Sequence, residues 1–412
     1  MIKKAAILST GDELTTGKVI DTNSAFIADR LFSLGIKVTA VLKVGDERES
    51  LLWAMRQAAE LAEIVIGTGG LGPTADDLTS EVVAELLGCP LLQSKEIAAA
   101  LRKRFDARGI PWTSNNLKQA LFPERAEIIA NPVGTAPGFR VSLGENKTLF
   151  WLSGVPQEMT AMFEQTVTPW IMAKVTPENQ FFSQSFKIYG LTESKLDELV
   201  KPVGLEPAIR LSFRAHYPDL TLRVIGTGGG EEQRHFIEAC KKIRLILGSH
   251  VYAEGDTTLE ERVGQLLLER QHTLALAESC TGGLISHRIT RIAGSSAYYL
   301  GGVTSYANEI KVKLLGVRST TLQKHGAVSR DTALEMSRGI RERTAADFGL
   351  SVTGVAGPGG GTPEKPVGTV WISIAQAKDH EARVFQFHGD RERIILATSQ
   401  AALNWLRLAI SA

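Results

Sequence analysis

The sequence contains few cysteines, almost no net charge and no long apolar run. The three cysteines, Cys89, Cys240 and Cys280, are widely spaced and form no Cys-x-x-Cys pair. This number and spacing exclude a disulfide framework and a cysteine-based zinc site, and they favour a reducing compartment such as the cytoplasm. The net charge of +1 and the lack of basic runs argue against direct binding to a nucleic acid.

The apolar residues are too dispersed for a membrane protein. The apolar core of the N-terminal stretch, residues 5–8, is too short for a signal peptide. No apolar run is long enough to cross a bilayer, so we expect no membrane partner. The composition, 43% hydrophobic and 22% charged, is that of an ordinary soluble protein, and the length of 412 residues predicts two to four domains.

The first 170 residues alternate between strand-like and helix-like patterns. KAAILST (4–10), KVTAVLKVG (37–45) and EIVIGTGG (63–70) have the apolar content of buried strands, and a helical pattern follows each of them. Alternation of this kind predicts a parallel sheet with helices on both faces. Ligands of such sheets bind at the carboxyl ends of the strands, where the glycine-rich segments of this chain fall.

Two breaks divide the rest of the chain. Prolines and polar residues interrupt the pattern at 167–180, and a second break lies at 253–258. The segment between them predicts a small α+β domain. Its GTGGG, residues 226–230, is interpreted as a strand-to-helix turn. After the second break, α/β alternation returns.

The stretch TLALAESCTGG, residues 273–283, places two nucleophiles where a predicted strand ends and a helix begins. Backbone N–H groups at this helix start could hold an oxyanion or a phosphate. Alternatively, Ser279 is a helix N-cap, and the glycines let helix and strand pack closely. Cys280 is the competing nucleophile, because a thiol at a helix N-terminus has a lowered pKa. Adjacent residues at a strand end point in opposite directions, so we expect one of the pair to face the ligand.

Two further segments of the C-terminal part contain residues that could take part in catalysis. GGVTSYANEIKVKLLGV (301–317) contains Lys311, and TGVAGPGGGTP (353–363) is a second glycine-rich loop after a predicted strand. These segments hold no histidine that could serve as a base. A lysine can take that role if burial or a nearby cation keeps its amine neutral. The alternative for Lys311 is a solvated charge on a helix face.

The N-terminal part has two strand-then-loop segments rich in Gly, Thr and Asp, residues 7–24 and 66–79. Their small residues would let backbone amides approach a phosphate, and Asp76 and Asp77 could hold Mg²⁺. The segments lack the lysine of a P-loop and do not match GxGxxG. The alternative is an aspartate-rich loop with helix N-caps.

The motifs AESCTGG, SYANEIKVKLLGV, VTGVAGPGGGTPEKPVGTVW and GDRERI together resemble the nicotinamide mononucleotide (NMN) deamidase domain of the CinA family, over residues 257–412. The resemblance implies a Ser/Lys amidohydrolase without a cofactor, which converts NMN to nicotinate mononucleotide and ammonia. It implies Ser279 as nucleophile and Lys311 as base, supported by Tyr306 and Thr353, with Arg393 as phosphate partner. The substrate-binding residues that it implies are Glu278, Thr281, Gly282, Gly283, Asn308, Gly354, Gly357 and Arg393.

Residues 1–168 resemble the molybdopterin-binding, MoaB/MogA-type domain in the version that CinA proteins carry, a three-layer α/β fold. This resemblance implies metal-dependent hydrolysis of ADP-ribose to AMP and ribose 5-phosphate. Asp46 and Asp77 match the family's acidic positions and are the expected ligands of a divalent metal ion. Asp12, Glu13 and Asp76 are weaker candidates for this role. The substrate contacts that it implies are Gly69, Gly70, Gly72 and Thr74.

Residues 176–250 resemble the KH-like connecting domain of the full-length family. A nucleic-acid-binding KH domain places its GXXG between two helices, whereas GTGGG here follows a strand, so no RNA-binding role is expected. The resemblance implies a spacer or dimerisation element and a homodimer. The sequence thus predicts a bifunctional pyridine-nucleotide salvage enzyme. The alternatives are a molybdopterin-binding protein and a non-catalytic module related to competence.

Overall fold

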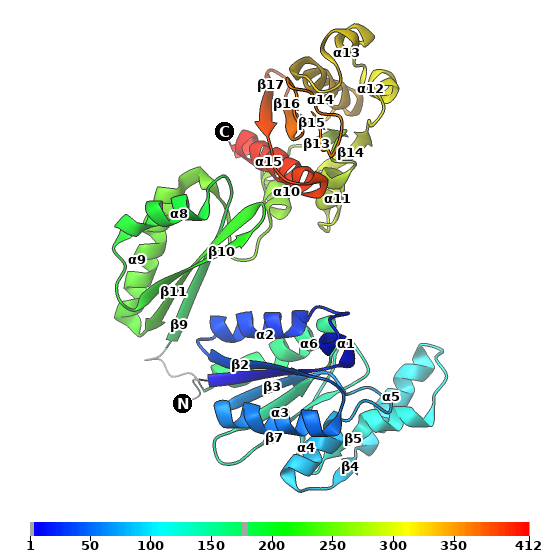
Figure 1. The fold of residues 1–412 in the computed structure, drawn as a ribbon, viewed down its shortest axis with the longest axis vertical. Helices are drawn as coiled ribbons and strands as arrows, with labels where there is room; N and C mark the ends of the chain where they lie inside the picture. Colours follow the sequence, from blue (N-terminus) through cyan, green and yellow to red (C-terminus); the bar gives the residue numbers. More distant parts are fainter. Residues whose placement is uncertain (1–3, 175–179, 412) are drawn as a thin grey trace. The chain divides into compact units, whose positions relative to one another are not determined.

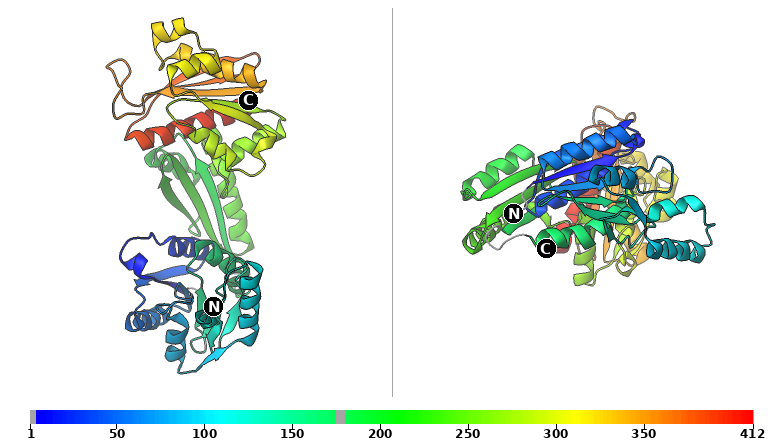
Figure 2. Two further views of the ribbon diagram at one scale, coloured as in Figure 1. Left: turned by 90° about the vertical axis from the view of Figure 1, so that its right-hand side faces the viewer. Right: turned by 90° about the horizontal axis from the view of Figure 1, so that it is seen from below.

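The structure is a computed structural model that describes residues 4–174 and 180–411 (Figures 1 and 2). The chain forms two compact units. One comprises residues 1–182 and 226–233, and the other comprises residues 183–225 and 234–412. Within the described residues, no helix combines the length and apolar character that a membrane crossing needs.

The first unit contains a six-stranded sheet with the order β2-β1-β3-β8-β7-β6. Strands β2, β1, β3 and β8 run parallel, whereas β7 pairs antiparallel with β8 and β6. The strands are β1 (Lys4–Thr10), β2 (Lys37–Val44), β3 (Ile64–Thr68), β4 (Leu91–Gln93), β5 (Leu121–Pro123), β6 (Glu127–Ile129), β7 (Gly138–Ser142) and β8 (Thr148–Leu152). The helices are α1 (Asp12–Thr15), α2 (Thr22–Ser33), α3 (Arg48–Leu61), α4 (Thr79–Leu87), α5 (Lys95–Ala107), η1 (Ser114–Ala120), α6 (Pro156–Met162), η2 (Phe163–Val167) and α7 (Thr168–Met172).

The sequence of β1 explains why helices cover both faces of this sheet. Successive side chains of a strand point to opposite faces. Ala5 and Ile7 pack in the core that includes α2 and α6, whereas Ala6 and Leu8 pack in the core that includes α3 and α4. Figure 1 shows these two pairs of helices on opposite sides of the sheet. The predicted three-layer α/β arrangement is therefore confirmed.

The loops after three parallel strands meet at one edge of this sheet. Strand β1 ends at Thr10, β3 at Thr68 and β8 at Leu152, and neighbouring residues of these strands pair in register. Because parallel strands place their carboxyl ends at the same edge, the segments that begin at Gly11, Gly69 and Ser153 come together there.

The middle segment forms a four-stranded sheet with the order β10-β11-β9-β12. GTGGG spans the end of a strand and the start of a helix, as expected of a turn, and another helix covers residues 193–200. The elements are β9 (Gln180–Ile188), α8 (Glu193–Val200), η4 (Lys201–Val203), β10 (Ile209–His216), β11 (Asp219–Gly228), α9 (Gly230–Leu247), η5 (Gly248–His250) and β12 (Val251–Glu254).

The C-terminal part has a five-stranded sheet with the order β14-β13-β15-β16-β17. Strand β13 lies parallel to β14 and β15, and the last two strands are antiparallel additions. The strands are β13 (Leu274–Glu278), β14 (Tyr299–Thr304), β15 (Phe348–Gly354), β16 (Thr369–Ala375) and β17 (His380–Gln386). The helices are α10 (Leu259–Glu269), α11 (Leu284–Thr290), η6 (Ser295–Ala297), α12 (Asn308–Leu315), α13 (Ser319–His325), α14 (Arg330–Thr344) and α15 (Arg391–Ser411).

The strand register of this sheet brings three motifs level with one another. Glu278, the last residue of β13, pairs with Thr304 of β14 on one side and with Val352 of β15 on the other. The next residues along these strands are therefore neighbours at the sheet edge. All three, Ser279, Ser305 and Thr353, are hydroxyl-bearing residues, and they belong to segments that the sequence analysis singled out.

Candidate active sites

Ser279 lies directly after β13 and lines a cavity of about 200 Å³ in the C-terminal part. The cavity brings together motifs that are far apart in the sequence. Of the expected site residues, Ser279, Tyr306, Lys311, Thr353 and Gly354 line it, together with Cys280 and Arg391. The residue Ser279 is nearly buried, with 9% of its surface exposed. Its hydroxyl is therefore largely shielded from bulk solvent.

Lys311 reaches this cavity from α12 and is 1% exposed. Its Nζ lies 3.1 Å from the Oγ of Ser279. The same amine donates to the backbone carbonyl of Ser305 at 2.6 Å and to that of Tyr306 at 3.4 Å. A solvated lysine on a helix face, the alternative considered above, does not describe this side chain.

These partners fix the direction of the lysine lone pair. Carbonyl oxygens only accept hydrogen bonds, so the two carbonyls take both N–H bonds of a neutral amine. The lone pair is then left for the third partner, the hydroxyl of Ser279. Burial lowers the pKa of Lys311, because the charged form loses solvation in this setting. The arrangement suits a general base that removes the proton of Ser279.

Cys280 lies in a different environment from Ser279. It packs in the apolar core of the C-terminal part, although it also contributes to the cavity wall. Burial raises the pKa of the Cys280 thiol to about 12, whereas a thiol at an exposed helix N-terminus would have a lowered pKa. At neutral pH the side chain is therefore a thiol and not a thiolate, which disfavours it as the nucleophile.

Two polar residues close the cavity near Ser279. Thr353 is 1% exposed, and its hydroxyl donates to the backbone carbonyl of Ala327 at 2.8 Å. Tyr306 is largely exposed, and its hydroxyl accepts a hydrogen bond of 2.9 Å from Arg391. Arg391 also donates to the carbonyl of Gly357 at 2.6 Å. The backbone carbonyl of Gly357 thus helps to hold Arg391 at the cavity.

The arginine that lines the cavity is Arg391, two residues before the one that the sequence analysis selected. Arg393 packs over the ring of Tyr217, with 4.3 Å between its Cζ and the ring centroid. Both arginines belong to the first turn of α15, where residues two apart point to different sides of the helix. Asn308, the first residue of α12, is exposed and is not among the described residues that line the cavity.

The turn after Ser279 differs from the expected oxyanion site. The amide of Gly282 donates to the carbonyl of Ser279, and the amide of Gly283 donates to the carboxylate of Glu278, both at 3.1 Å. The backbone N–H of Thr281 has no acceptor among the described residues. Two amides are therefore occupied within the turn, and the expected substrate-binding residues Thr281, Gly282 and Gly283 are not among the described residues that line the cavity. Glu278 itself faces inwards and is 1% exposed.

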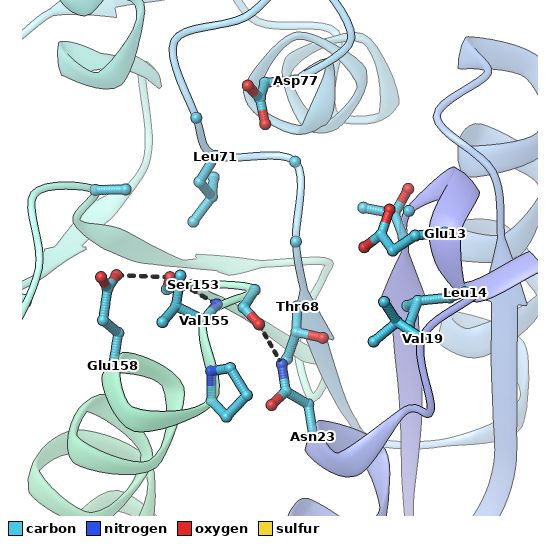
Figure 3. Close-up of a pocket in the computed structure, with 18 of the residues that line it drawn as sticks. Glu13, Leu14, Val19, Asn23, Thr68, Leu71, Asp77, Ser153, Val155 and Glu158 are labelled. Atoms are coloured by element: carbon cyan, nitrogen blue, oxygen red, sulfur yellow. Dashed lines mark hydrogen bonds between the residues drawn. The ribbon is translucent and has the colours of Figure 1, made fainter. Parts of the chain in front are cut away.

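A second and larger pocket lies at the edge of the first unit where β1, β3 and β8 end. Its volume is about 570 Å³. In Figure 3, Glu13, Leu14 and Val19 form one wall, and Leu71, Ser153, Val155 and Glu158 lie across the pocket. Gly69, Gly70 and Gly72 line the pocket as expected, whereas Thr74 is not among its lining residues.

The glycines after β3 are required by the geometry of the loop. Gly69 and Gly70 have φ values of +99° and +61°, which L residues with side chains rarely adopt. A Cβ on Gly69 would lie 2.4 Å from the carbonyl oxygen of Thr10. The tight turn brings the β3 loop against the end of β1, and so forms the floor of the pocket.

Asp46 lines this pocket and is hydrogen-bonded to Asp12. Each carboxylate accepts from the backbone N–H of the other residue, at 3.1 and 3.2 Å. Asp46 also accepts from the hydroxyl of Thr10 at 2.9 Å. Burial raises the pKa of Asp46, and the carboxylates of Asp12 and Glu13 raise it further. A nearby cation would thus stabilise the charged form of Asp46.

Asp77 lines the same pocket from the loop before α4. Its Oδ2 accepts from the amide of Thr74 at 2.9 Å and also from the Thr74 hydroxyl. A Cβ on Gly72 would lie 2.4 Å from this oxygen, so glycine there makes room for the carboxylate. Thr74, expected to contact substrate, instead orients Asp77.

The carboxylates that line this pocket are the possible ligands of a metal ion. The lining contains six carboxylates and no lysine or arginine; the six are Glu13, Asp21, Asp46, Asp76, Asp77 and Glu158. Among the described residues, however, no three His, Cys, Asp or Glu side chains converge as a ready cage. Mg²⁺ commonly binds through one or two carboxylates and completes its shell with waters and substrate phosphates. The carboxylates of the lining would suit an ion held in that way, and the two expected ligands, Asp46 and Asp77, both line the pocket.

The segment after β8 also lines this pocket, although the sequence analysis assigned it no role. Glu158 accepts from the hydroxyl of Ser153 and from the side-chain amide of Asn131, both at 2.7 Å (Figure 3). Asn23 donates to the carbonyl of Gly154 at 2.8 Å. These contacts connect the start of α2, the segment from Ser153 to α6 and the loop that contains Asn131. The signal that could have identified them is the position of LSGVPQEM directly after a buried strand.

Two known protein families match separate parts of this chain. Residues 256–410 match the family described as the CinA C-terminal domain, and residues 6–173 match a family described as a probable molybdopterin binding domain. A protein of Halothermothrix orenii, named as competence-damage inducible, is 42% identical over 98% of this chain and 97% of its own length. A CinA-like protein of Geotalea uraniireducens is 42% identical over 98% of this chain and 97% of its own length.

Single-domain relatives have been solved. The structure of a competence/damage inducible protein of Agrobacterium tumefaciens is 41% identical and covers 37% of this chain and 94% of that chain, with a TM-score of 0.36. The two family matches and the nearly full-length relatives lead to one conclusion. The chain belongs to the CinA family, with a MoaB/MogA-like N-terminal domain and a CinA C-terminal domain.

Proposed function

We propose that the C-terminal domain hydrolyses the carboxamide of NMN to nicotinate mononucleotide and ammonia. The observation that carries this proposal is the 3.1 Å contact between the buried amine of Lys311 and the hydroxyl of Ser279. A hydroxyl nucleophile with a buried lysine base suits acyl transfer. The motif resemblance supplies NMN as substrate, and no cofactor is needed for this reaction.

The proposed reaction follows from the positions of these groups. Lys311 takes the proton of Ser279 as the hydroxyl oxygen attacks the carboxamide carbon. A backbone N–H group of the turn after Ser279 would stabilise the oxyanion. The carbon–nitrogen bond then breaks as the ammonium of Lys311 protonates the leaving nitrogen, which departs as ammonia. Water, deprotonated by the same amine, hydrolyses the ester and restores Ser279.

The fixed guanidinium of Arg391 supports recognition of a phosphate at the cavity mouth. Arginine offers a planar pair of donors that matches phosphate oxygens. Arg391 is held by Tyr306 and Gly357, whereas Arg393 is engaged with Tyr217. We therefore reassign the phosphate role, expected of Arg393, to Arg391.

The two arginines give a matched test. A hydrogen bond to a charged group contributes about 1.5–3 kcal/mol, which corresponds to roughly a 10- to 150-fold change in affinity. Arg391→Ala should raise the KM for NMN by about this factor, and Arg393→Ala should change it much less. Steady-state kinetics on both variants measure the effect. A larger effect from Arg393→Ala would restore the original assignment.

The direct test of the deamidase proposal is to incubate the purified full-length chain with NMN and to measure ammonia and nicotinate mononucleotide. Equal amounts of both products are expected. Nicotinamide riboside, which has the same carboxamide but no phosphate, should be a poorer substrate. If neither compound yields ammonia, the proposal is wrong.

We further propose that the N-terminal domain cleaves ADP-ribose to AMP and ribose 5-phosphate with a divalent metal ion. The acidic pocket without lysine or arginine supports a need for a cation, because a diphosphate would otherwise be repelled. When bound, such an ion supplies charge neutralisation at the diphosphate and activation of water. Asp46 and Asp77 would hold it, and the glycine loop after β3 would let the diphosphate approach the backbone.

Asp46→Asn and Asp77→Asn should each lower ADP-ribose cleavage by about 10²-fold or more, since removal of a metal ligand weakens both binding and activation. Asp106→Asn, a change at an exposed position on α5 outside the pocket, is the control. Release of AMP measures the activity, with and without a chelator. Cleavage that survives the chelator would contradict the metal proposal. Binding of a pterin without any cleavage of ADP-ribose would favour the cofactor-binding alternative.

Taken together, these proposals describe a bifunctional enzyme of pyridine-nucleotide salvage. NMN and ADP-ribose share the ribose phosphate unit, so both pockets would recognise related compounds. We also propose that the protein works as a cytoplasmic homodimer without nucleic-acid or membrane partners. Light scattering on the purified chain would test the dimer, and a monomer at micromolar concentration would contradict it.

A further inference from the structure

The carboxylate of Glu278 takes no part in the bond-making steps above, although it directly precedes the nucleophile. Its side chain accepts five hydrogen bonds. The donors are the hydroxyl of Thr281 at 2.7 Å, the amides of Gly283 and Ile285 at 3.1 Å, the amide of Ser286 at 2.8 Å and the hydroxyl of Ser286 at 2.6 Å. A buried charge with this many donors is fully engaged by the protein and does not face the cavity.

All five donors belong to the turn after Ser279 and the first turn of α11. The first N–H groups of a helix lack partners within the helix, and a carboxylate there also interacts favourably with the helix dipole. Gly283, the N-cap of α11, has a φ of +100° and provides no capping side chain. Glu278 thus supplies the cap from the preceding strand and closes residues 278–286 into one rigid turn.

The backbone of the same residue connects this turn to the lysine. The carbonyl of Glu278 accepts from the amide of Ser305 at 2.7 Å and from the Ser305 hydroxyl at 3.2 Å. The carbonyl of Ser305 in turn accepts from the Nζ of Lys311 at 2.6 Å. Glu278 therefore contacts both halves of the site. Its side chain holds the turn that carries Ser279, and its backbone carbonyl holds Ser305, which in turn binds the amine of Lys311.

We propose that Glu278 is a positioning residue, which holds Ser279 at the amine of Lys311 by fixing the turn on which the nucleophile lies. The inference rests on the proposed Ser/Lys chemistry, and it replaces the substrate-binding role that the sequence suggested for Glu278. A carboxylate suits this role because it only accepts hydrogen bonds. In glutamine, one oxygen becomes an NH₂ group that would face N–H and O–H donors, so the turn would lose its cap with little change in volume.

The test compares Glu278→Gln with a matched control, Glu335→Gln. Glu335 lies in α14, and its carboxylate accepts hydrogen bonds at the start of α13, from the amide and guanidinium of Arg318 and from the hydroxyl of Thr321. It is not among the described residues that line the cavity. The full-length variants are treated with a fluorophosphonate, which labels reactive serines, and the rate of modification of Ser279 is followed by peptide mass spectrometry.

A displacement of about 1 Å at a reacting group can cost on the order of 10²-fold in rate. We expect Glu278→Gln to slow the labelling of Ser279 by about this factor, and to lower kcat for NMN with little change in KM. Glu335→Gln should label at the wild-type rate. Labelling of Glu278→Gln at the wild-type rate, in a folded protein, would overturn the proposal. The labelling needs no substrate, so the result stands even if NMN is not the substrate.

A smaller change keeps the test decisive if Glu278→Gln does not fold. Thr281→Val removes one hydrogen bond to Glu278, and Thr321→Val removes the corresponding bond to Glu335; both threonines are buried. Both changes should lower the melting temperature to a similar degree. We expect only Thr281→Val to slow the labelling of Ser279, and equal rates in the two variants would contradict a positioning role.

Discussion

Ser279→Ala is expected to abolish the release of ammonia from NMN, with a loss on the order of 10⁴-fold or more, because it removes the hydroxyl that forms the ester intermediate. Cys280 does not replace it, since burial raises the pKa of that thiol to about 12 and holds the side chain in the core. Ammonia release from the purified variant measures the loss. Cleavage of ADP-ribose by the same sample should be unchanged, because its pocket belongs to the other unit.

Cys280→Ala is the control for this change. The alanine leaves a small space in the apolar core, so it should lower stability modestly while ammonia release persists. If Cys280→Ala loses activity and Ser279→Ala retains it, the nucleophile has been assigned to the wrong residue. Equal loss in both variants, with both folded, would point to a role for the whole turn and would leave the serine mechanism without support.

Lys311→Met should lower the rate by about 10²- to 10⁴-fold, the usual contribution of a general base. Lys311→Arg should be equally inactive, because a guanidinium does not lose its proton at any working pH. In the wild type the neutral amine is the active form, so kcat/KM should rise with pH through the lowered pKa of Lys311 and then level off. The pH profile of ammonia release measures this limb. A rate that is flat across that range, or that falls, would contradict a lysine base.

The same shift in pKa affects the stability of the wild type. The pKa of Lys311 is lowered in the folded state from its ordinary value of 10.5, so between these two values the unfolded chain binds a proton that the folded chain does not. The free energy of unfolding should therefore gain a contribution as pH rises through this window. The gain is complete above 10.5 and is lost as pH falls through the lowered pKa. Denaturant titrations of Lys311→Met should lack this increment, and an identical pH dependence in both proteins would contradict burial as the cause.

The sequence predicted the elements that carry the sites better than it predicted which side chains face them. Alternation of buried strands and helices located the sheet edges, because parallel strands bring their following loops together. The motifs then placed Ser279 and Lys311 in one cavity. The choice between Arg391 and Arg393 could not be made from GDRERI. A shift of one residue in the start of α15 rotates every side chain by about 100°, which follows from 3.6 residues per turn.

Long-range partners explain the other differences. The inward direction of Glu278 depends on donors up to Ser286, and the pairing of Asp12 with Asp46 joins two loops 34 residues apart. No local pattern encodes such contacts. The two carbonyls that orient Lys311 are backbone groups of Ser305 and Tyr306, which carry no signal in residue type. Their position beside Lys311 depends on the path of the chain after β14, which the sequence alone does not give.

The central claim is that the hydroxyl of Ser279 bonds to the carboxamide carbon of NMN. The most direct measurement is to mix the full-length protein with NMN, quench with acid within milliseconds to seconds, and analyse its peptides by mass spectrometry. We predict a peptide that carries the acyl group of nicotinate mononucleotide on Ser279, absent from Ser279→Ala and from samples without NMN. Ammonia release accompanied by an acyl group on Cys280, or ammonia release that persists in Ser279→Ala, would contradict the account.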